Sequence, residues 1–244
     1  EVVASPAVED GRVVVLTTSG RLVALDTDEG KLQWTLSEEQ PPLTLRSAGA
    51  PIITNGAVIY GRADGKVGIA LLSNGQPVRQ SKVADPRGAT ELDRMVDVDA
   101  SPLIAGDELY AIAYNGQLMA RKLMSGDEVW KRKYSGYRDM AVTGNAIVLT
   151  DSRSHLFAVD RRNGLELWSN TQLENRTVTA PVVLGDYVVV GDVEGYLYWL
   201  DRTDGSIKAM QQLDSSGLYA APLVDGDTLY VQSRGGKLYA IKRP

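Results

Sequence analysis

The chain contains no cysteine, and only one histidine and one phenylalanine occur among its 244 residues. Without cysteine, disulfides, thiolate metal sites and a cysteine nucleophile are all excluded. The lone histidine, His155, excludes histidine-rich metal sites, and its position just after a turn predicts an exposed side chain. No apolar run approaches the length of about 18 residues that a membrane-spanning helix needs.

An excess of charge of one sign is also missing. The 26 basic and 31 acidic residues are intermixed, for a formal net charge of −5. Nucleic-acid binding requires a basic patch, so no nucleic-acid partner is expected. The sequence also lacks a nucleophile elbow, a phosphate-binding loop and any loop rich enough in oxygen ligands for calcium. These absences favour a protein without a catalytic site, metal or cofactor.

The chain does contain a repeat of about 40 residues with several marker positions. Most units begin with a proline preceded by alanine or serine: Pro6, Pro51, Pro102, Pro181 and Pro222. A glycine follows at a constant distance in each of these units: Gly20, Gly65, Gly116, Gly195 and Gly236. A second glycine column follows ten residues further on: Gly30, Gly75, Gly126 and Gly205.

One further unit fits between these despite lacking the first two markers. It has Met140 in the proline column and Ser154 in the first glycine column, and it regains register at Gly164. A last column holds Arg79 in one unit and Ala209 in another, and tryptophan in three: Trp34, Trp130 and Trp168. Six repeats result.

Each repeat is predicted to form four short strands. In the first unit, turn residues separate the apolar run 13–16, a strand in which Leu25 breaks strict alternation by one step, and a strand that begins near Trp34. Apolar runs between such turns suit strands buried on both faces. The column glycines are expected at positive φ. A four-stranded unit of this length is a β-propeller blade.

We therefore predict an all-β fold, a β-propeller of four-stranded blades, as one domain over residues 1–244. The repeats lie at approximately 1–40, 41–91, 92–133, 134–173, 174–214 and 215–244. The chain opens within the repeat pattern, and the last repeat stops before its fourth strand. Upstream residues are therefore expected in the parent protein.

The unit pattern, Ala/Ser-Pro, then Gly-x-Leu-x-Ala-Leu-Asp, then Gly-x-x-x-Trp, resembles the repeat of quinoprotein dehydrogenases. More specific stretches are similar to the BamB family, the propeller lipoproteins of the outer-membrane β-barrel assembly machinery. They are Leu43–Arg46, Thr90–Arg94, Asp97–Asp99, Ala113–Gly116, Val190–Asp192, Glu194–Trp199 and Asp214–Gly217.

That resemblance implies an eight-bladed ring, of which about six blades are present, at the periplasmic face of the outer membrane. It also implies an N-terminal lipid anchor that these residues do not contain, and binding to the POTRA domains of BamA. Unfolded outer-membrane protein strands are a second partner class, which could add to an exposed blade edge. Two other functions remain open. A quinoprotein-type dehydrogenase shares the repeat but needs a calcium site and commonly a vicinal disulfide, and a cytosolic WD-type scaffold would carry Gly-His and Trp-Asp signatures.

Two insertions, residues 37–46 and 85–99, follow the last strands of the first two repeats. Equivalent loops of successive blades emerge on one face, so both are expected in one raised patch. In the first, Leu43 and Leu45 share a face beside Arg46, a composition typical of binding hot spots. In the second, Asp97 and Asp99 also share a face.

The resemblance implies that these five residues contact the partner. The alternatives are that the leucines fill a gap between blades beneath Arg46, and that the aspartates form a structural salt bridge or cap a turn.

Overall fold

The computed structural model describes residues 1–45 and 49–244, which form strands, turns and loops. Within these residues, no helix is long and apolar enough to cross a membrane. The chain divides into two compact units, Glu1–Tyr137 and Arg138–Pro244, and each is described by itself.

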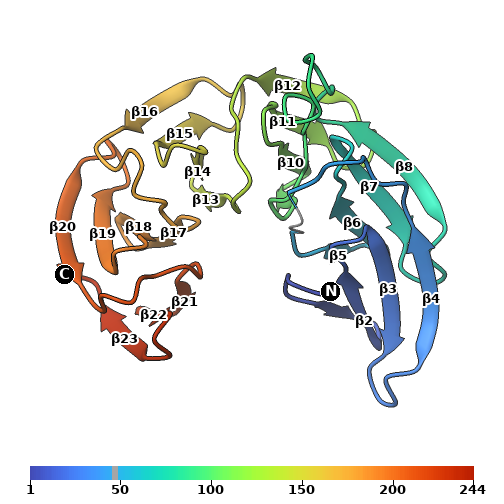
Figure 1. The fold of residues 1–244 in the computed structure, drawn as a ribbon, viewed down its shortest axis with the longest axis horizontal. Coiled ribbons are helices and arrows are strands. Elements are labelled where there is room, and N and C mark those ends of the chain that lie inside the picture. Colours follow the sequence, from blue (N-terminus) through green and yellow to red (C-terminus); the bar gives the residue numbers. More distant parts are fainter. Residues whose placement is uncertain (46–48) are drawn as a thin grey trace. The chain divides into compact units, whose positions relative to one another are not determined.

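The first unit contains three antiparallel sheets in which strands adjacent in sequence pair side by side (Figure 1). The first sheet consists of β1 (Ala7–Glu9), β2 (Arg12–Leu16), β3 (Arg21–Asp26) and β4 (Leu32–Ser37). The second consists of β5 (Ile52–Thr54), β6 (Ala57–Gly61), β7 (Lys66–Leu71) and β8 (Pro77–Lys82). The third consists of β9 (Leu103–Ala105), β10 (Glu108–Ile112), β11 (Leu118–Lys122) and β12 (Glu128–Arg132).

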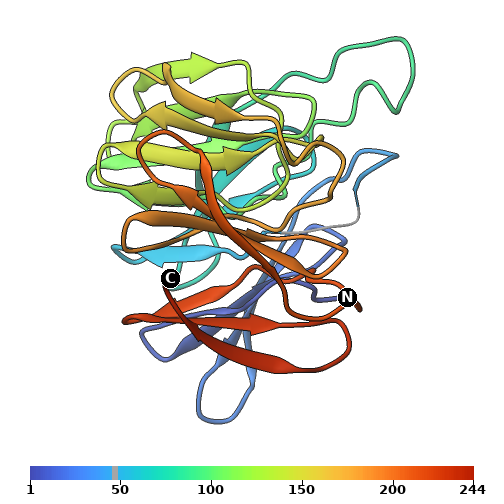
Figure 2. The ribbon, with the colours of Figure 1, turned by 90° about the vertical axis from the view of Figure 1, so that its left-hand side faces the viewer.

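The second unit repeats this plan, with its sheets drawn from yellow to red in Figure 2. Its first sheet consists of β13 (Ala141–Thr143), β14 (Ala146–Thr150), β15 (Leu156–Asp160) and β16 (Glu166–Asn170). The next consists of β17 (Val182–Leu184), β18 (Tyr187–Gly191), β19 (Tyr196–Asp201) and β20 (Ile207–Gln212). The last has three strands, β21 (Leu223–Asp225), β22 (Thr228–Gln232) and β23 (Leu238–Lys242). The predicted all-β chain of six blade-like sheets is confirmed.

Consecutive sheets within a unit bury apolar side chains against each other. On β6, Val58 and Tyr60 pack into the cluster shared with the first sheet, whereas Ile59 packs into the cluster shared with the third. On β18, Val188 and Val189 likewise enter different clusters. Because both faces of a central sheet are covered, these strands are continuous apolar runs rather than alternating ones.

The irregular fourth repeat keeps the same structural register as the others. Strand β13 begins directly after Met140, just as β5 begins directly after Pro51. Ser154 takes the glycine position with a φ of 72°, close to the 84° of Gly195. The expected positive φ fails at Gly116, because the preceding Asn115 adopts it instead, with a φ of 49°. Asparagine tolerates this conformation better than most residues, so it can take the turn position.

The strand carrying Leu25 pairs with the next strand through a bulge. The β3–β4 register shifts between Ala24 and Leu25, which accounts for the broken alternation in the sequence. Corresponding shifts occur between Ile69 and Ala70 and between Ala158 and Val159. The bulge is therefore a repeated feature of the blades.

The predicted exposure of His155 is wrong, because only 6% of this residue is accessible. Residues 171–177 fold back over the turn, and Asn175 donates its backbone N–H to the carbonyl of Arg153 at 2.9 Å. The imidazole Nδ1 lies 3.1 Å from Asp151 Oδ2, and the ring meets Phe157 edge-on. The long loop that follows β16 therefore covers a position that is exposed in a simple hairpin.

In two sheets, the tryptophan of the last column bonds to the next sheet of the same unit. The indole Nε1–H of Trp34 donates to the carbonyl of Leu72 at 2.8 Å, and that of Trp168 donates to the carbonyl of Arg202 at 2.9 Å. A Cβ at Gly205 would lie only 2.3 Å from the Trp168 ring. Glycine is thus required at Gly205 because the Trp168 indole lies against it.

We expect Trp168→Ala to lower the free energy of unfolding by about 3–5 kcal/mol, since it leaves a cavity and removes the hydrogen bond to Arg202. Urea denaturation followed by circular dichroism measures this. The matched control is Leu167→Ala, because Leu167 is 54% exposed and should change stability by no more than about 0.5 kcal/mol. Equal effects of the two substitutions would contradict the role of the indole.

Candidate functional site

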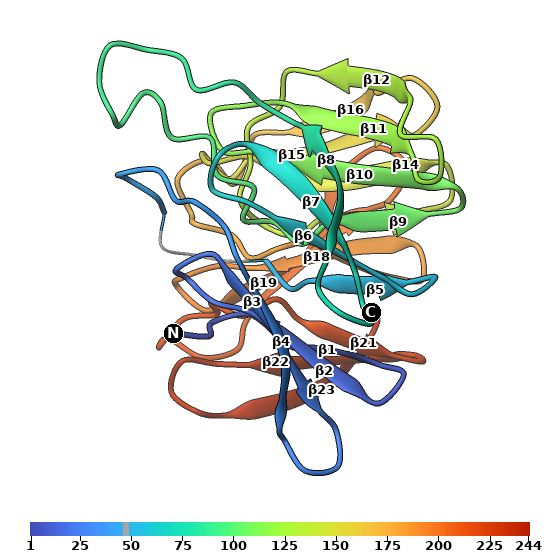
Figure 3. The ribbon, with the colours of Figure 1, turned by 90° about the vertical axis from the view of Figure 1, so that its right-hand side faces the viewer.

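The two insertions emerge from the same end of the first unit. In each antiparallel sheet, the segment that leaves the fourth strand lies at the same end as the turn between the second and third strands. Residues 38–45 leave β4 and residues 85–99 leave β8, and Figure 3 shows both projecting from one side. These two segments are called the insertion face below.

The second insertion ends wedged between two sheets. Val98 donates its N–H to the carbonyl of Arg62 at 3.0 Å, and Tyr114 donates its N–H to the carbonyl of Asp97 at 2.9 Å. A Cβ at Gly61 would lie 2.0 Å from the Val98 carbonyl oxygen, so only glycine allows this approach. The backbone around Asp97 is therefore fixed by main-chain bonds on both sides.

The first insertion is attached to the second through Asp97. The backbone N–H of Leu45 donates to Asp97 Oδ1 at 3.0 Å, and Ala50 donates to Ser101 Oγ at 2.9 Å. Leu43 is 41% exposed, whereas Leu45 is half-buried. Arg46, the remaining predicted contact residue of this segment, lies outside the described residues. The structure thus brings together Leu45 and Asp97, and it leaves Leu43 accessible.

Asp97 and Asp99 are both buried, with accessible fractions of 1% and 7%. Among the described residues, the Oδ2 atoms of both have no hydrogen-bond partner. Burial raises the pKa of Asp97, against the opposing effect of the Leu45 N–H. Burial and then the charge of Asp97 raise the pKa of Asp99 to about 7. The pair therefore presents carboxyl groups that a cation or a hydrogen-bond donor would stabilise.

Beside this pair lies an ionic network that our sequence analysis did not find. Arg62, only 8% exposed, places Nη1 2.7 Å from Glu38 Oε2 and donates to both carboxylate oxygens of Asp64. Tyr60 donates its hydroxyl to Glu38 Oε1 at 2.6 Å, and burial followed by this bond raises the pKa of the phenol. Glu38 directly follows β4, so the network attaches the start of the first insertion to the second sheet.

The sequence feature that could have revealed this network is Arg62 itself, the residue that begins the β6–β7 turn. In the first and fifth sheets this position holds a side chain that caps its own turn, because Thr17 and Asp192 accept the N–H of Arg21 and of Tyr196. Arg62 cannot accept a hydrogen bond, and its guanidinium pairs with acidic side chains instead.

A pocket at the insertion face is lined in part by Glu38, Thr44, Tyr60, Arg62, Asp97 and Asp99.

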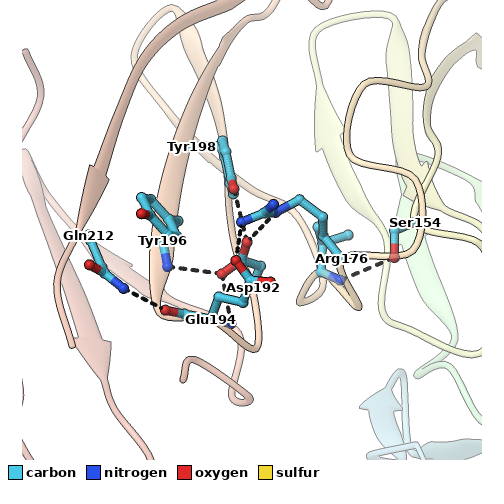
Figure 4. Close-up of polar contacts among 8 residues, drawn as sticks. Ser154, Arg176, Asp192, Glu194, Tyr196, Tyr198 and Gln212 are labelled. Atoms are coloured by element: carbon cyan, nitrogen blue, oxygen red, sulfur yellow. Dashed lines mark hydrogen bonds and ion pairs between the residues drawn. The ribbon is translucent and has the colours of Figure 1, made fainter. Parts of the chain in front are cut away.

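A second buried ion pair lies in the other unit (Figure 4). Arg176 donates from Nε to Asp192 Oδ2 and from Nη2 to Glu194 Oε2, both at 2.7 Å. Tyr198 donates to Asp192 Oδ2 at 2.9 Å, and Asp192 is fully buried. The bond to Asp192 raises the pKa of Arg176. Every oxygen of this aspartate is used, so the cluster stabilises its turn and offers no free ligand.

In the part of the chain that the structure describes, no group of three or more His, Cys, Asp or Glu side chains could hold a metal ion. The two carboxylates of Asp97 and Asp99 fall short of the six to eight oxygens that calcium takes.

Comparison with known proteins identifies close relatives. A family model described as outer membrane protein assembly factor BamB matches residues 1–170 and 166–243. The assembly factor BamB of Shewanella oneidensis is 46% identical over 183 residues, which cover 75% of this chain and 46% of that protein. BamB of Vibrio cholerae is 46% identical over 184 residues, or 75% of this chain and 48% of that protein. The chain spans about half the length of the curated relatives it matches.

Solved structures agree with this similarity. The crystal structure of BamB from Moraxella catarrhalis matches 98% of this chain and 71% of that chain, with a TM-score of 0.92 and 27% identity. The computationally designed Ika8 protein shares the fold alone, with a TM-score of 0.74 and 15% identity. The predicted propeller class is thereby confirmed.

We expect the buried Asp99 to make the protein less stable as the pH rises. With a folded-state pKa of about 7 against the ordinary 3.8 of an aspartate carboxyl, the folded state retains a proton that the unfolded chain has released. The stabilising contribution is therefore complete below pH 3.8 and is lost by about pH 7. Asp99→Asn should remove this loss and be more stable than the parent at pH 8, by roughly 1–3 kcal/mol.

Urea denaturation of parent and variant at pH 4, 6 and 8 measures this difference. Glu91→Gln is the control, because Glu91 lies exposed on the same insertion and pairs only at the surface, at 3.6 Å from Arg94. A stability difference between Asp99→Asn and parent that does not grow with pH would show that Asp99 is ionised throughout.

Proposed function

The chain belongs to the family of outer membrane protein assembly factor BamB, and from that membership we propose that it is a non-enzymatic scaffold of the machinery that assembles outer-membrane β-barrel proteins. It binds the POTRA domains of BamA and aids the delivery or folding of outer-membrane proteins. It works at the periplasmic face of the outer membrane, held there by an N-terminal lipid anchor of the parent protein.

The observation that carries the proposed site is the junction of the two insertions in the first unit. The bond from Leu45 N–H to Asp97 Oδ1 joins them, and the network of Glu38 and Arg62 fixes the first insertion to its scaffold. Loops held on a rigid framework are common binding elements because little conformational entropy is lost when they bind.

The chemistry of this junction suits a partner with an apolar contact and a cationic group. Leu43 is an exposed apolar side chain beside the half-buried Leu45. Asp97 and Asp99 have carboxylate oxygens without partners among the described residues, and these can accept charge-assisted hydrogen bonds. We propose Leu43, Leu45, Arg46, Asp97 and Asp99 as the contact residues. Asp97 would thus act both directly and by holding Leu45.

Unfolded outer-membrane protein strands are a second proposed partner class. The fourth strand of each four-stranded sheet is an edge strand in the described residues, as β4 and β8 show. An extended segment can pair with such an edge through main-chain hydrogen bonds, which place few demands on sequence.

A quinoprotein-type dehydrogenase is the less favoured function. Its vicinal disulfide cannot form in a chain without cysteine. The curated relatives from Shewanella oneidensis and Vibrio cholerae are both named as assembly factors.

We expect Leu43→Ala, Arg46→Ala and Asp97→Ala each to weaken binding to the BamA POTRA domains by tenfold or more. Truncating a hot-spot side chain typically costs about 2 kcal/mol or more. Isothermal titration calorimetry of the POTRA domains into each variant measures the loss, and a denaturation curve establishes that each variant is folded.

Leu32→Ala is the matched control, because Leu32 is 63% exposed on β4 at the end of the sheet away from the insertions. It should bind like the parent. If the unsubstituted chain does not bind the POTRA domains, the proposed partner is refuted for this chain. Normal binding by all three insertion variants would instead keep the partner and refute the surface.

A further inference from the structure

In most sheets the last-column residue is paired with a side chain of complementary size. Trp34 lies opposite Ala24 across the β3–β4 pair, and Trp168 lies opposite Ala158 across β15–β16. In the β17–β20 sheet the sizes are exchanged, because Ala209 lies opposite Trp199. Each of these three strand pairs therefore carries one indole.

The second sheet breaks this rule. Here Arg79 lies opposite Ile69, so neither strand supplies an indole. Arg79 Nη1 donates to the carbonyl of Met124 in the β11–β12 turn at 3.2 Å. A Cβ at Gly126 would lie 2.3 Å from the same nitrogen, just as a Cβ at Gly75 would lie 2.5 Å from the Trp34 ring. The Arg79 guanidinium thus lies where the far edge of an indole would lie, but it does not fill the rest of the space that an indole would take.

The space left over is an open apolar pocket of about 180 Å³. Its walls include Ile59, Ile69, Val78, Arg79, Leu123 and Met124. Two of these side chains are unusually accessible, Val78 at 58% and Met124 at 77%. Aliphatic cavities of about 150 Å³ bind benzene, so this pocket has room for an aromatic ring.

We propose that this pocket binds an aromatic side chain, tryptophan or tyrosine, of a partner protein. The equivalent space beside the first sheet holds an indole, which defines the shape of the occupant. Arg79 would interact with the face of the ring by cation–π attraction, and the Met124 sulfur also favours aromatic contact. The β11–β12 turn supplies backbone carbonyls for an indole N–H or a phenol, as Leu72 does for Trp34.

The pocket lies at the opposite end of the sheets from the insertion face. It includes Asn55 of the β5–β6 turn and Met124 of the β11–β12 turn, whereas the insertions leave the other ends of β4 and β8. A strand of five or six residues separates the two ends by about 16–20 Å. The inference is therefore independent of the proposed POTRA binding, and either can fail alone.

The test uses the whole chain with N-acetyltryptophanamide as the probe, followed by methyl chemical shifts in NMR. We expect saturable shifts at the methyl groups of Ile59, Ile69, Leu123 and Met124. N-acetylleucinamide, which is apolar but not aromatic, should bind at least fivefold more weakly. Equal binding of the two probes, or no shifts at these methyl groups, would overturn the proposal.

Two variants sharpen the result. Ile69→Ala combined with Arg79→Trp restores the alanine–tryptophan pair of the other sheets, and it should abolish binding because the chain then fills its own pocket. Arg79→Gln keeps a hydrogen-bonding side chain without the charge and should weaken binding of the aromatic probe at least threefold. If the double variant does not fold, Arg79→Gln decides alone, and affinity equal to the parent's would overturn the aromatic site.

Discussion

The central sheets of this protein have two apolar faces, and only neighbouring sheets can cover them. The constraint is visible within single strands, where Val58 and Ile59 are both buried but pack into clusters on opposite sides of β6. An isolated blade could not satisfy it, since a sheet covered on one side would alternate apolar and polar residues. Stability is therefore shared between consecutive sheets, as in other repeat proteins.

The same constraint explains the tryptophan and glycine columns. The indole of Trp34 spans from its own sheet to the turn of the next, where Gly75 leaves room for it. Where the column residue changes, the interface must be completed in another way. Opposite Ala209 the indole comes from Trp199 on the neighbouring strand, whereas neither strand supplies an indole at Arg79, where an apolar pocket is open. Framework residues thus determine where the surface is filled and where it can accept a partner.

Much of the fold was predictable because the marker positions of the repeat hold residue types that have fixed structural roles. The columns located the irregular fourth sheet through Met140 and Ser154, although neither residue matches the consensus. Contacts made by long loops were not predictable. The burial of His155 depends on residues 171–177 folding back over it, and no local pattern encodes that.

The insertions were located from their length alone, and their internal chemistry was not. The sequence places Asp97 and Asp99 on one face of an extended segment, and the structure shows both deeply buried, with Asp97 bonded to the backbone of Leu45. The supporting network of Glu38 and Arg62 joins residues far apart in sequence. Such pairings depend on the stacking of sheets, which spacing along one strand cannot specify.

Hydrogen–deuterium exchange of this chain with and without the BamA POTRA domains tests the central claim most directly, because it reports on the whole chain at once. The account expects slower exchange on binding in residues 38–45 and 85–99, and unchanged exchange in the turns at the other end of the same sheets, such as 26–30 and 71–75. Protection confined to those turns, or no change anywhere in the chain, would contradict it.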